Sequence, residues 1–234
     1  MIIKISFIQL IGRVIRFLLR SEELRRTREV WLKLFSFDSA IKNLRSMKRT
    51  FIAIKINPDE SLRLLLEELR DELSESRIKW VETENIHITL AFIGNTVERD
   101  IELIKEILQS LCSQHRPFPL ELAGIDVFRT IADPRVVFLG ITTSDALHAF
   151  REAICDRLRS EGLYNDARPF KPHLTIGRPK YISDRDILSA IIESYRGKTI
   201  QSLEVESVIY YESILKQEGP VYKQIGKYIL NSSS

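Results

Sequence analysis

The spacing of apolar and polar residues changes repeatedly along the chain, and it predicts an ordered series of strands and helices. Residues 50–56 (TFIAIKI) and 87–94 (HITLAFIG) alternate with period two, which is typical of half-buried strands. In 58–75, leucines recur at helical spacing after an Asn-Pro-Asp helix-start signal. By the same criteria we expect further helices over 98–114, 144–162 and 184–197, and further strands over 78–82, 118–128, 135–143, 173–179, 201–213 and 222–230.

This element order predicts an α+β fold. Strands that alternate with helices usually favour a parallel sheet, but the long strand segments between Leu203 and Leu230, joined by a short link, favour antiparallel pairing. The elements also divide into two halves, the first of which ends near residue 143.

One short motif occurs once in each half. ENIHITLAFIGN contains His87 and Thr89, and FKPHLTIGRP, 86 residues later, contains His173 and Thr175 in the same order of histidine, apolar residue, threonine, apolar residue. A given histidine is followed by that pattern in roughly one case in a hundred on ordinary residue usage. An ancestral duplication would explain the pair, with each half supplying one strand to a shared cleft. The two remaining histidines lack the pattern and are interpreted as surface loop and helix positions: His115 and His148.

Strand geometry gives the motif a chemical meaning. Residues i and i+2 project from the same face of a strand about 7 Å apart. We therefore expect His87, Thr89 and Ala91 on one face. The opposite face takes Ile88, Leu90 and Phe92. A histidine exchanges a proton near neutral pH, and a threonine hydroxyl binds an anionic oxygen without adding charge. Two such pairs would hold a phosphate between an imidazole that accepts a proton and one that donates a proton.

Composition limits the alternatives. The chain has 234 residues, a hydrophobic fraction of 44% and a net charge of +3, so it can bury a full core as one or two compact lobes. Residues 1–47 hold ten Lys/Arg against four Asp/Glu, which leaves 25 against 28 in the rest. Because the main body is slightly acidic, any attraction for phosphates must come from local clustering of positive charge. Cys112 and Cys155 are expected to be reduced thiols in a cytoplasmic protein. No metal-ligand pattern such as HExxH is present, so no metal and no cofactor is expected.

Residues 1–46 differ from the rest of the chain. Basic residues interrupt every apolar run before about 18 residues are reached, so no membrane span is predicted. Three interpretations remain open: an extension from a non-native upstream start, a peripheral amphipathic helix, and a basic targeting segment. MKRTFIAIKI, from Met47, reads as the start of a domain. We therefore predict a basic extension over 1–46 and one functional domain over 47–234.

From Met47 to its end the sequence resembles the two-histidine phosphoesterase superfamily, and within it the RNA 2′,3′-cyclic phosphodiesterases, also called 2′-5′ RNA ligases. The blocks that carry the resemblance occur in the family's order: RTFIAIKI, IHITLAFIGN, DPRVVFLGI, FKPHLTIGRP and YYESILKQEGPVYKQI. The resemblance implies a bilobed, pseudo-duplicated α+β fold in which two antiparallel sheets face a central cleft with helices outside. It also implies hydrolysis of a terminal 2′,3′-cyclic phosphate on RNA, or of a nucleoside cyclic phosphate, to a 2′-phosphate.

Carried onto this chain, the resemblance makes His87 the proton donor and His173 the proton acceptor. Thr89 and Thr175 would bind the non-bridging oxygens. Similar proteins also place a basic residue at the position of Arg178. That residue is five positions after His173, so it faces away from the site unless Gly177 introduces a bulge. Lys171 could add positive charge near the phosphate, and Phe128 and Phe170 could stack a base, although a phenylalanine is more often a core residue. Ala91 stands where relatives often carry a longer polar side chain, which argues against a substrate contact from this position.

Several alternatives stay open at this point. Hydrolysis and ATP-independent 2′-5′ ligation share one transition state run in opposite directions. A nucleotide-binding or RNA-binding module without turnover would keep the cleft, although it has no need for two proton-transfer groups. A metal hydrolase would need a ligand cluster. We expect a monomer.

Overall fold

The computed structural model describes residues 47–142, 145–217 and 219–231, and the predictions made for residues 1–46 lie outside them. The described residues from Lys48 onward form one compact unit. Within the part of the chain that the structure describes, no helix has the length and apolar character needed to cross a bilayer.

Nine antiparallel strands are found among the described residues, and the α+β class predicted from the sequence is confirmed. Their order in the sheet is β7-β4-β5-β6-β3-β1-β8-β9, with β2 paired to β6 off this path. The strands span β1 (Lys48–Lys55), β2 (Arg77–Trp80), β3 (His87–Thr96), β4 (Phe118–Thr130), β5 (Asp133–Ile141), β6 (His173–Tyr181), β7 (Thr199–Val205), β8 (Ser207–Leu215) and β9 (Pro220–Ile229).

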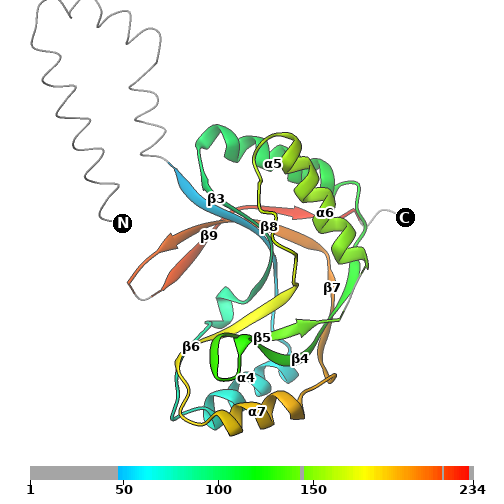
Figure 1. Cartoon of the computed structure of the whole chain (residues 1–234). Helices are drawn as coiled ribbons and strands as arrows, with labels where there is room; N and C mark the ends of the chain where they lie inside the picture. The colour runs from blue at the N-terminus through cyan, green and yellow to red at the C-terminus, as the bar shows by residue number, and fades with distance from the viewer. Residues whose placement is uncertain (1–46, 143–144, 218, 232–234) are drawn as a thin grey trace, which may run out of the picture. The chain divides into compact units, whose positions relative to one another are not determined.

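The sheet is continuous, but at one point two neighbouring strands are joined by a single residue pair. β3 and β6 pair through Ile88 and Leu174, whereas the neighbouring strand pairs have long registers. We call β3, β1, β8 and β9 the His87 half, and β6, β2, β5, β4 and β7 the His173 half. We expected two antiparallel sheets, and the structure instead joins both halves into one strongly curled sheet (Figure 1).

One strand prediction was wrong. Alternation over 201–213 predicts a single strand, but the segment consists of parts of β7 and β8, separated at Glu206. β7 pairs with β4 and β8 pairs with β1, so the chain passes from the His173 half to the His87 half at this residue. A pattern of alternating apolar residues continues through such a change of partner, which is why the sequence does not reveal it.

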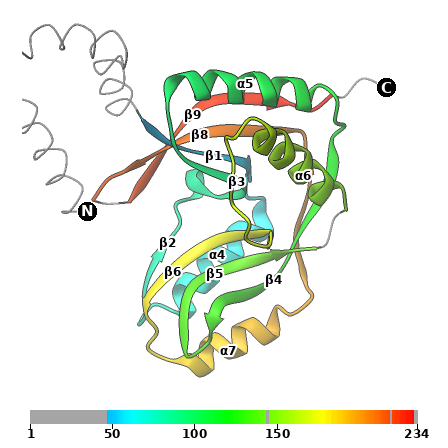
Figure 2. The same cartoon turned by 45° about the horizontal axis from the view of Figure 1, so that its top comes forward.

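Four α-helices pack against the sheet within the described ranges: α4 (Glu60–Glu72), α5 (Glu98–Cys112), α6 (Asp145–Ser160) and α7 (Arg185–Ser194). The Asp59 side chain caps α4 by accepting a hydrogen bond from the Leu62 amide, and Asp184 caps α7 in the same way. α5 and α6 lie side by side against the His87 half, while α4 and α7 lie against the His173 half (Figures 1 and 2).

The two faces of the sheet differ in what covers them. The helices bury the main core, which includes both cysteines as unpaired thiols, Cys112 and Cys155. A separate and smaller group of buried residues, Phe51, Ala53, Ile209 and Tyr211, with Tyr222 packed against it, surrounds His87. Two members of this group, Phe51 and Tyr222, line a cleft on this face of the His87 half.

Candidate active site

Both histidine motifs open into one cleft. The cleft has a volume of about 430 Å³, and His87, Thr89, His173, Thr175 and Arg178 all line it. Strands from both halves therefore contribute to one space, as the repeated motif predicted.

A second hollow of about 590 Å³ lies against α5 and the end of α6. Its lining includes four carboxylates, Asp100, Glu102, Glu106 and Glu161. Because these negative charges repel a phosphate, the cleft between the motifs is the better site for an anionic ligand.

The pairing of β3 with β6 brings the four motif side chains together. Ile88 is opposite Leu174 in an antiparallel register. The residues on either side of this pair, His87 and Thr89 on β3 and His173 and Thr175 on β6, all line the cleft.

Each catalytic candidate is held by the backbone just before its strand. His87 Nδ1 lies 2.6 Å from the carbonyl oxygen of Asn85, and His173 Nδ1 lies 2.7 Å from that of Lys171. A carbonyl oxygen only accepts hydrogen bonds, so Nδ1 carries the proton and donates it in both rings. The other nitrogen, Nε2, is then the atom that accepts or donates a proton during chemistry.

Aromatic rings fix the two imidazoles from the sides. The His87 ring centroid is 5.0 Å from that of Phe51 and 5.1 Å from that of Tyr222, the latter edge to face. The His173 centroid is 4.7 Å from that of Phe128, also edge to face. Rings held at these separations restrict rotation of each imidazole and exclude water from its flanks.

The surroundings of both rings disfavour the charged imidazolium. Burial lowers the pKa of His87 to about 4, and the positive charges of Lys55 and Arg178 act in the same direction. Burial also lowers the pKa of His173, again with a contribution from Arg178. Both rings are therefore neutral near pH 7 in the free protein. A bound phosphate anion raises both pKa values, because it stabilises the charged form.

A bulge corrects the predicted faces of both motif strands. In the β1–β3 register, Ile52 pairs with Ala91 and Ala53 with Thr89, so Leu90 has no partner residue. Ala91, predicted on the site face, is buried at 2% exposure in the main core. Phe92, predicted on the opposite face, lines the cleft instead. The strict alternation expected for 87–92 therefore fails after Thr89.

β6 repeats this irregularity, and it brings Arg178 into the cleft. Phe138 pairs with Thr175 and Val137 with Gly177, which leaves Ile176 as the extra residue. This shift restores Arg178 to the side of His173, the condition on which its assignment depended. Gly177 is needed here, since a Cβ at this position would lie 2.9 Å from Ile78 Cγ2 and 3.0 Å from Trp80 Cε3 of β2.

The other contact candidates lie behind the cleft or beside it. Phe128 stacks on Phe138 with 4.4 Å between ring centroids, under His173. Phe170 is partly buried and packs against the core. Lys171 contributes its carbonyl to His173, while its side chain is exposed.

Sequence reasoning missed several residues that the fold brings to the cleft. These residues come from β1, β2, β3 and β9, and they add two cations and three aromatic rings: Arg49, Lys79, Trp80, Phe92 and Tyr222. Arg49 stacks on Phe92, with Cζ 4.7 Å from the ring centroid. Only the strand order brings such distant segments together, and no local motif marks them.

No metal-binding group was found in the described part of the chain. There, no three His, Cys, Asp or Glu side chains are arranged so that they would hold an ion. The positive charge that faces a ligand in the cleft comes from Arg49, Lys79 and Arg178.

The chain is similar to known proteins of one family. Residues 58–208 match the model of the 2′-5′ RNA ligase superfamily. A protein of Archaeoglobus fulgidus named RNA 2′,3′-cyclic phosphodiesterase is 33% identical over 178 residues, which cover 76% of this chain and 97% of that protein. A Thermotoga maritima protein of the same name is 34% identical over 180 residues, covering 75% and 91% of the two chains.

Solved structures show the same fold. A crystal structure of a Thermus thermophilus protein superposes with a TM-score of 0.64 at 24% identity, covering 79% of this chain and all of that one, 100%. E. coli LigT in complex with 3′-AMP gives a TM-score of 0.60 at 21% identity, with coverages of 79% and 98%. From the family match and the curated relatives together, this chain belongs to the 2′-5′ RNA ligase superfamily.

Proposed function

We propose that this protein is an RNA 2′,3′-cyclic phosphodiesterase that hydrolyses a terminal 2′,3′-cyclic phosphate to a 2′-phosphate. The observation that carries the proposal is the pair of imidazoles, each anchored through Nδ1 to a backbone carbonyl, on two adjoining strands that line one cleft. Relatives at 33% and 34% identity carry this name, which supports the assignment.

In the proposed reaction the two histidines have opposite tasks. Neutral His173 accepts a proton at Nε2 from a water molecule as the water oxygen attacks phosphorus. His87 takes up a second proton, at Nε2, when the bound phosphate anion raises its pKa. The bond between phosphorus and the 3′ oxygen breaks, and His87 donates this proton to that oxygen. The product carries a 2′-phosphate and a free 3′ hydroxyl, and the two rings have exchanged protonation states with respect to the start. Solvent then restores the original states.

The neighbouring groups stabilise the charge of the reacting phosphate. The hydroxyls of Thr89 and Thr175 donate hydrogen bonds to the non-bridging oxygens, and Arg178 supplies a positive charge. Burial lowers the pKa of His87 to about 4 in the free protein, so the charged acid forms only in the complex, where the phosphate anion stabilises it. No metal is required in this scheme.

Three finer expectations belong to the same proposal. The substrate is the cyclic phosphate end of RNA, and the protein acts as a cytoplasmic monomer. The bilobed fold arose by duplication, with two sheets that became one. Similar environments of the two histidines support the duplication, since β3 and β6 share the backbone anchor and the bulge after the threonine.

A direct assay tests the function. Purified protein is incubated with a nucleoside 2′,3′-cyclic phosphate and with a short RNA that ends in one, and phosphorus NMR assigns the product. We expect a 2′-phosphate from the RNA end, with a rate that EDTA leaves unchanged. Tight binding without turnover would favour a binding module, and 2′-5′ joining to a second RNA in place of hydrolysis would favour a ligase. Loss of activity with EDTA, restored by zinc or manganese, would favour a metal hydrolase.

A further inference from the structure

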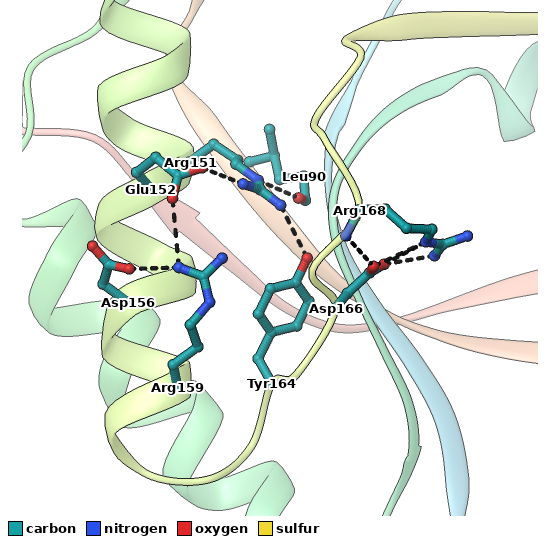
Figure 3. A network of polar contacts seen from close by, with 8 residues as sticks. All are labelled: Leu90, Arg151, Glu152, Asp156, Arg159, Tyr164, Asp166 and Arg168. Atoms are coloured by element: carbon teal, nitrogen blue, oxygen red, sulfur yellow. Dashed lines mark hydrogen bonds and ion pairs between the residues drawn. The ribbon is translucent and has the colours of Figure 1, made fainter.

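Helix α6 carries an arginine that is almost completely buried behind the cleft. Arg151 is 5% exposed, and its guanidinium contacts groups from β3, from α6 itself and from the segment 163–172 (Figure 3). A buried guanidinium is costly unless its donors are satisfied. The groups that pair with Arg151 lie next to the two histidine motifs, and this placement suggests its role.

The first contact reaches the motif strand of the His87 half. Arg151 Nε donates a hydrogen bond to the carbonyl oxygen of Leu90 at 3.4 Å. Leu90 is the extra residue of the β3 bulge and follows Thr89 directly. β3 and β6 pair at Ile88, one residue before Thr89. Arg151 therefore donates to the backbone of β3 where the register with β1 is broken.

The second contact reaches the chain that leads to the other motif. Residues 163–172 contain no helix or strand and end at His173. Near the start of this segment, the Tyr164 hydroxyl accepts a hydrogen bond from Arg151 Nη2 at 3.0 Å. Near its end, the Phe170 ring lies under the guanidinium, with its centroid 4.8 Å from Cζ. One side chain thus holds both ends of the segment.

The remaining donor is paired with a carboxylate. Arg151 Nη1 donates to Glu152, which has 49% of its side chain exposed and also pairs with Arg159 (Figure 3). The charge is therefore balanced at the edge of the network, while the two inner contacts are neutral. Of the groups that Arg151 contacts, Leu90 is one residue from Thr89 and Phe170 is three residues from His173. A residue that only filled space would not need contacts at these two places.

We propose that Arg151 is a positioning residue that sets the two motifs at the spacing needed for the reaction. It acts through Leu90 on the Thr89 side and through Tyr164 and Phe170 on the His173 side, without contacting the substrate. The inference rests on the proposed phosphodiesterase function.

The test compares three single variants by steady-state kinetics on a nucleoside cyclic phosphate. Arg151→Met keeps much of the volume and removes every donor, and we expect kcat to fall about tenfold to a hundredfold, as for misplacement of a catalytic group from a distance. KM should stay within about threefold, because no substrate contact is lost. Arg151→Lys should fall between wild type and Arg151→Met, since it keeps a charged donor.

Gln201→Leu is the matched structural control. Gln201 is also buried, at 7% exposure, and it also joins two segments, by donating to the Asn57 carbonyl and accepting from the Asp59 amide. It lies on β7 and does not line the cleft. We expect Gln201→Leu to lower the melting temperature while kcat stays near the wild-type value. An equal loss of kcat in both variants at equal melting temperature would overturn the proposal.

Nitrogen NMR of the imidazoles gives a readout that needs no turnover. In wild type, His173 should show the Nδ1-protonated tautomer set by the Lys171 carbonyl. Arg151→Met should shift the His173 signals toward a tautomer mixture. His115, whose Nδ1 is bonded to the Leu111 carbonyl away from the cleft, should not change. If the wild-type protein does not hydrolyse the cyclic phosphate, the proposed function fails, and the NMR comparison still decides the role of Arg151.

A milder variant covers the case in which Arg151→Met does not fold. Tyr164→Phe keeps the ring and removes only the hydroxyl that Arg151 contacts. We expect a loss of roughly threefold to tenfold in kcat, the range for one hydrogen bond, together with a smaller shift of the His173 signals. Unchanged kcat and unchanged His173 signals in Tyr164→Phe would refute the positioning role.

Discussion

Ile88 of β3 pairs with Leu174 of β6, and this pair lies between the two histidine motifs. Both side chains are fully buried in the core, at 0% exposure, on the face opposite the cleft. Apolar packing on one face of the junction therefore fixes the polar residues on the other. The motif needs an apolar residue between histidine and threonine because that residue supports the register of the site.

The two histidines should act as a unit. His87→Ala and His173→Ala should each lower kcat by about a hundredfold to ten-thousandfold, the usual range for general acid–base catalysis. The double variant should be little worse than the more damaging single one, because both protons move in one reaction. Steady-state hydrolysis of a nucleoside cyclic phosphate measures this.

His115→Gln serves as the control for that series, because His115 packs on Phe150 away from the cleft and should keep wild-type turnover. A His87→Ala protein with normal kcat beside an inactive His173→Ala protein would mean that one motif alone is catalytic. The paired mechanism would then be wrong.

The two threonines should matter less than the histidines. Thr89→Val and Thr175→Val replace each hydroxyl by a methyl group of similar size and leave the strand intact. Each removes one neutral hydrogen bond to a phosphate oxygen, about 0.5–1.5 kcal/mol or roughly twofold to tenfold in kcat/KM, and more if the bond tightens in the transition state. Binding of inorganic phosphate, followed by calorimetry, should weaken in parallel. Unchanged phosphate affinity in both variants would remove the threonines from the anion site.

The site was predictable where local pattern determines it. Alternation over 87–90 predicts which side of β3 carries His87 and Thr89, and the repeated motif in β6 predicts a shared cleft. The pattern fails at Ala91 and Phe92 because a bulge adds one residue to the strand without requiring a particular side chain there. In β6 a signal exists, since Gly177 stands where β2 approaches too closely for a Cβ.

The strand order was much less predictable. Antiparallel pairing follows from the long strands near the end of the chain, but nothing local shows that Glu206 separates β7 from β8 or that each joins a different half. Partners of a strand are chosen by contacts between residues far apart in sequence. For the same reason, Arg49 and Tyr222 could be placed in the cleft only once β1 and β9 had been located.

Arg178 should contribute mainly through its charge. Arg178→Gln should lower kcat/KM by roughly tenfold to a hundredfold if the guanidinium bonds the phosphate, because hydrogen bonds to charged groups contribute about 1.5–3 kcal/mol. Arg178→Lys should recover part of the loss, and the salt dependence of KM should weaken in Arg178→Gln. Arg185→Gln, an exposed change on α7, is the control and should have no effect. Equal kinetics for Arg178→Gln and Arg185→Gln would exclude Arg178 from the site.

A chain that begins at Met47 should keep the turnover of the full chain. β1 starts at Lys48, and both motif strands with all cleft residues named above lie within 48–231. The region that matches the superfamily model, 58–208, lies within the same limits. Circular dichroism and a thermal melt would show that the shortened protein folds, and kinetics on the same cyclic phosphate would compare activity. Loss of folding or of most activity would show that the predicted domain boundary is misplaced.

The pH dependence should differ between the free protein and its complex. In the reactive state one ring is charged and the other is neutral, so the rate falls when both rings are charged and when both are neutral. The profile of kcat/KM reports the free protein, in which burial lowers the pKa of His87 to about 4 and also lowers that of His173. Its alkaline limb should therefore lie below about pH 6.5, the ordinary histidine value.

Bound phosphate anion opposes this shift, because it stabilises the imidazolium form and raises both pKa values. The kcat profile, which reports the complex, should consequently have its optimum at higher pH than the kcat/KM profile. Arg178→Gln should shift the kcat/KM profile to higher pH, because the charge of Arg178 lowers the pKa of both rings. Initial rates measured between pH 4 and pH 9 at constant ionic strength separate the two profiles. Coincident optima in wild type, with no displacement in Arg178→Gln, would contradict this account of how the cleft controls its two histidines.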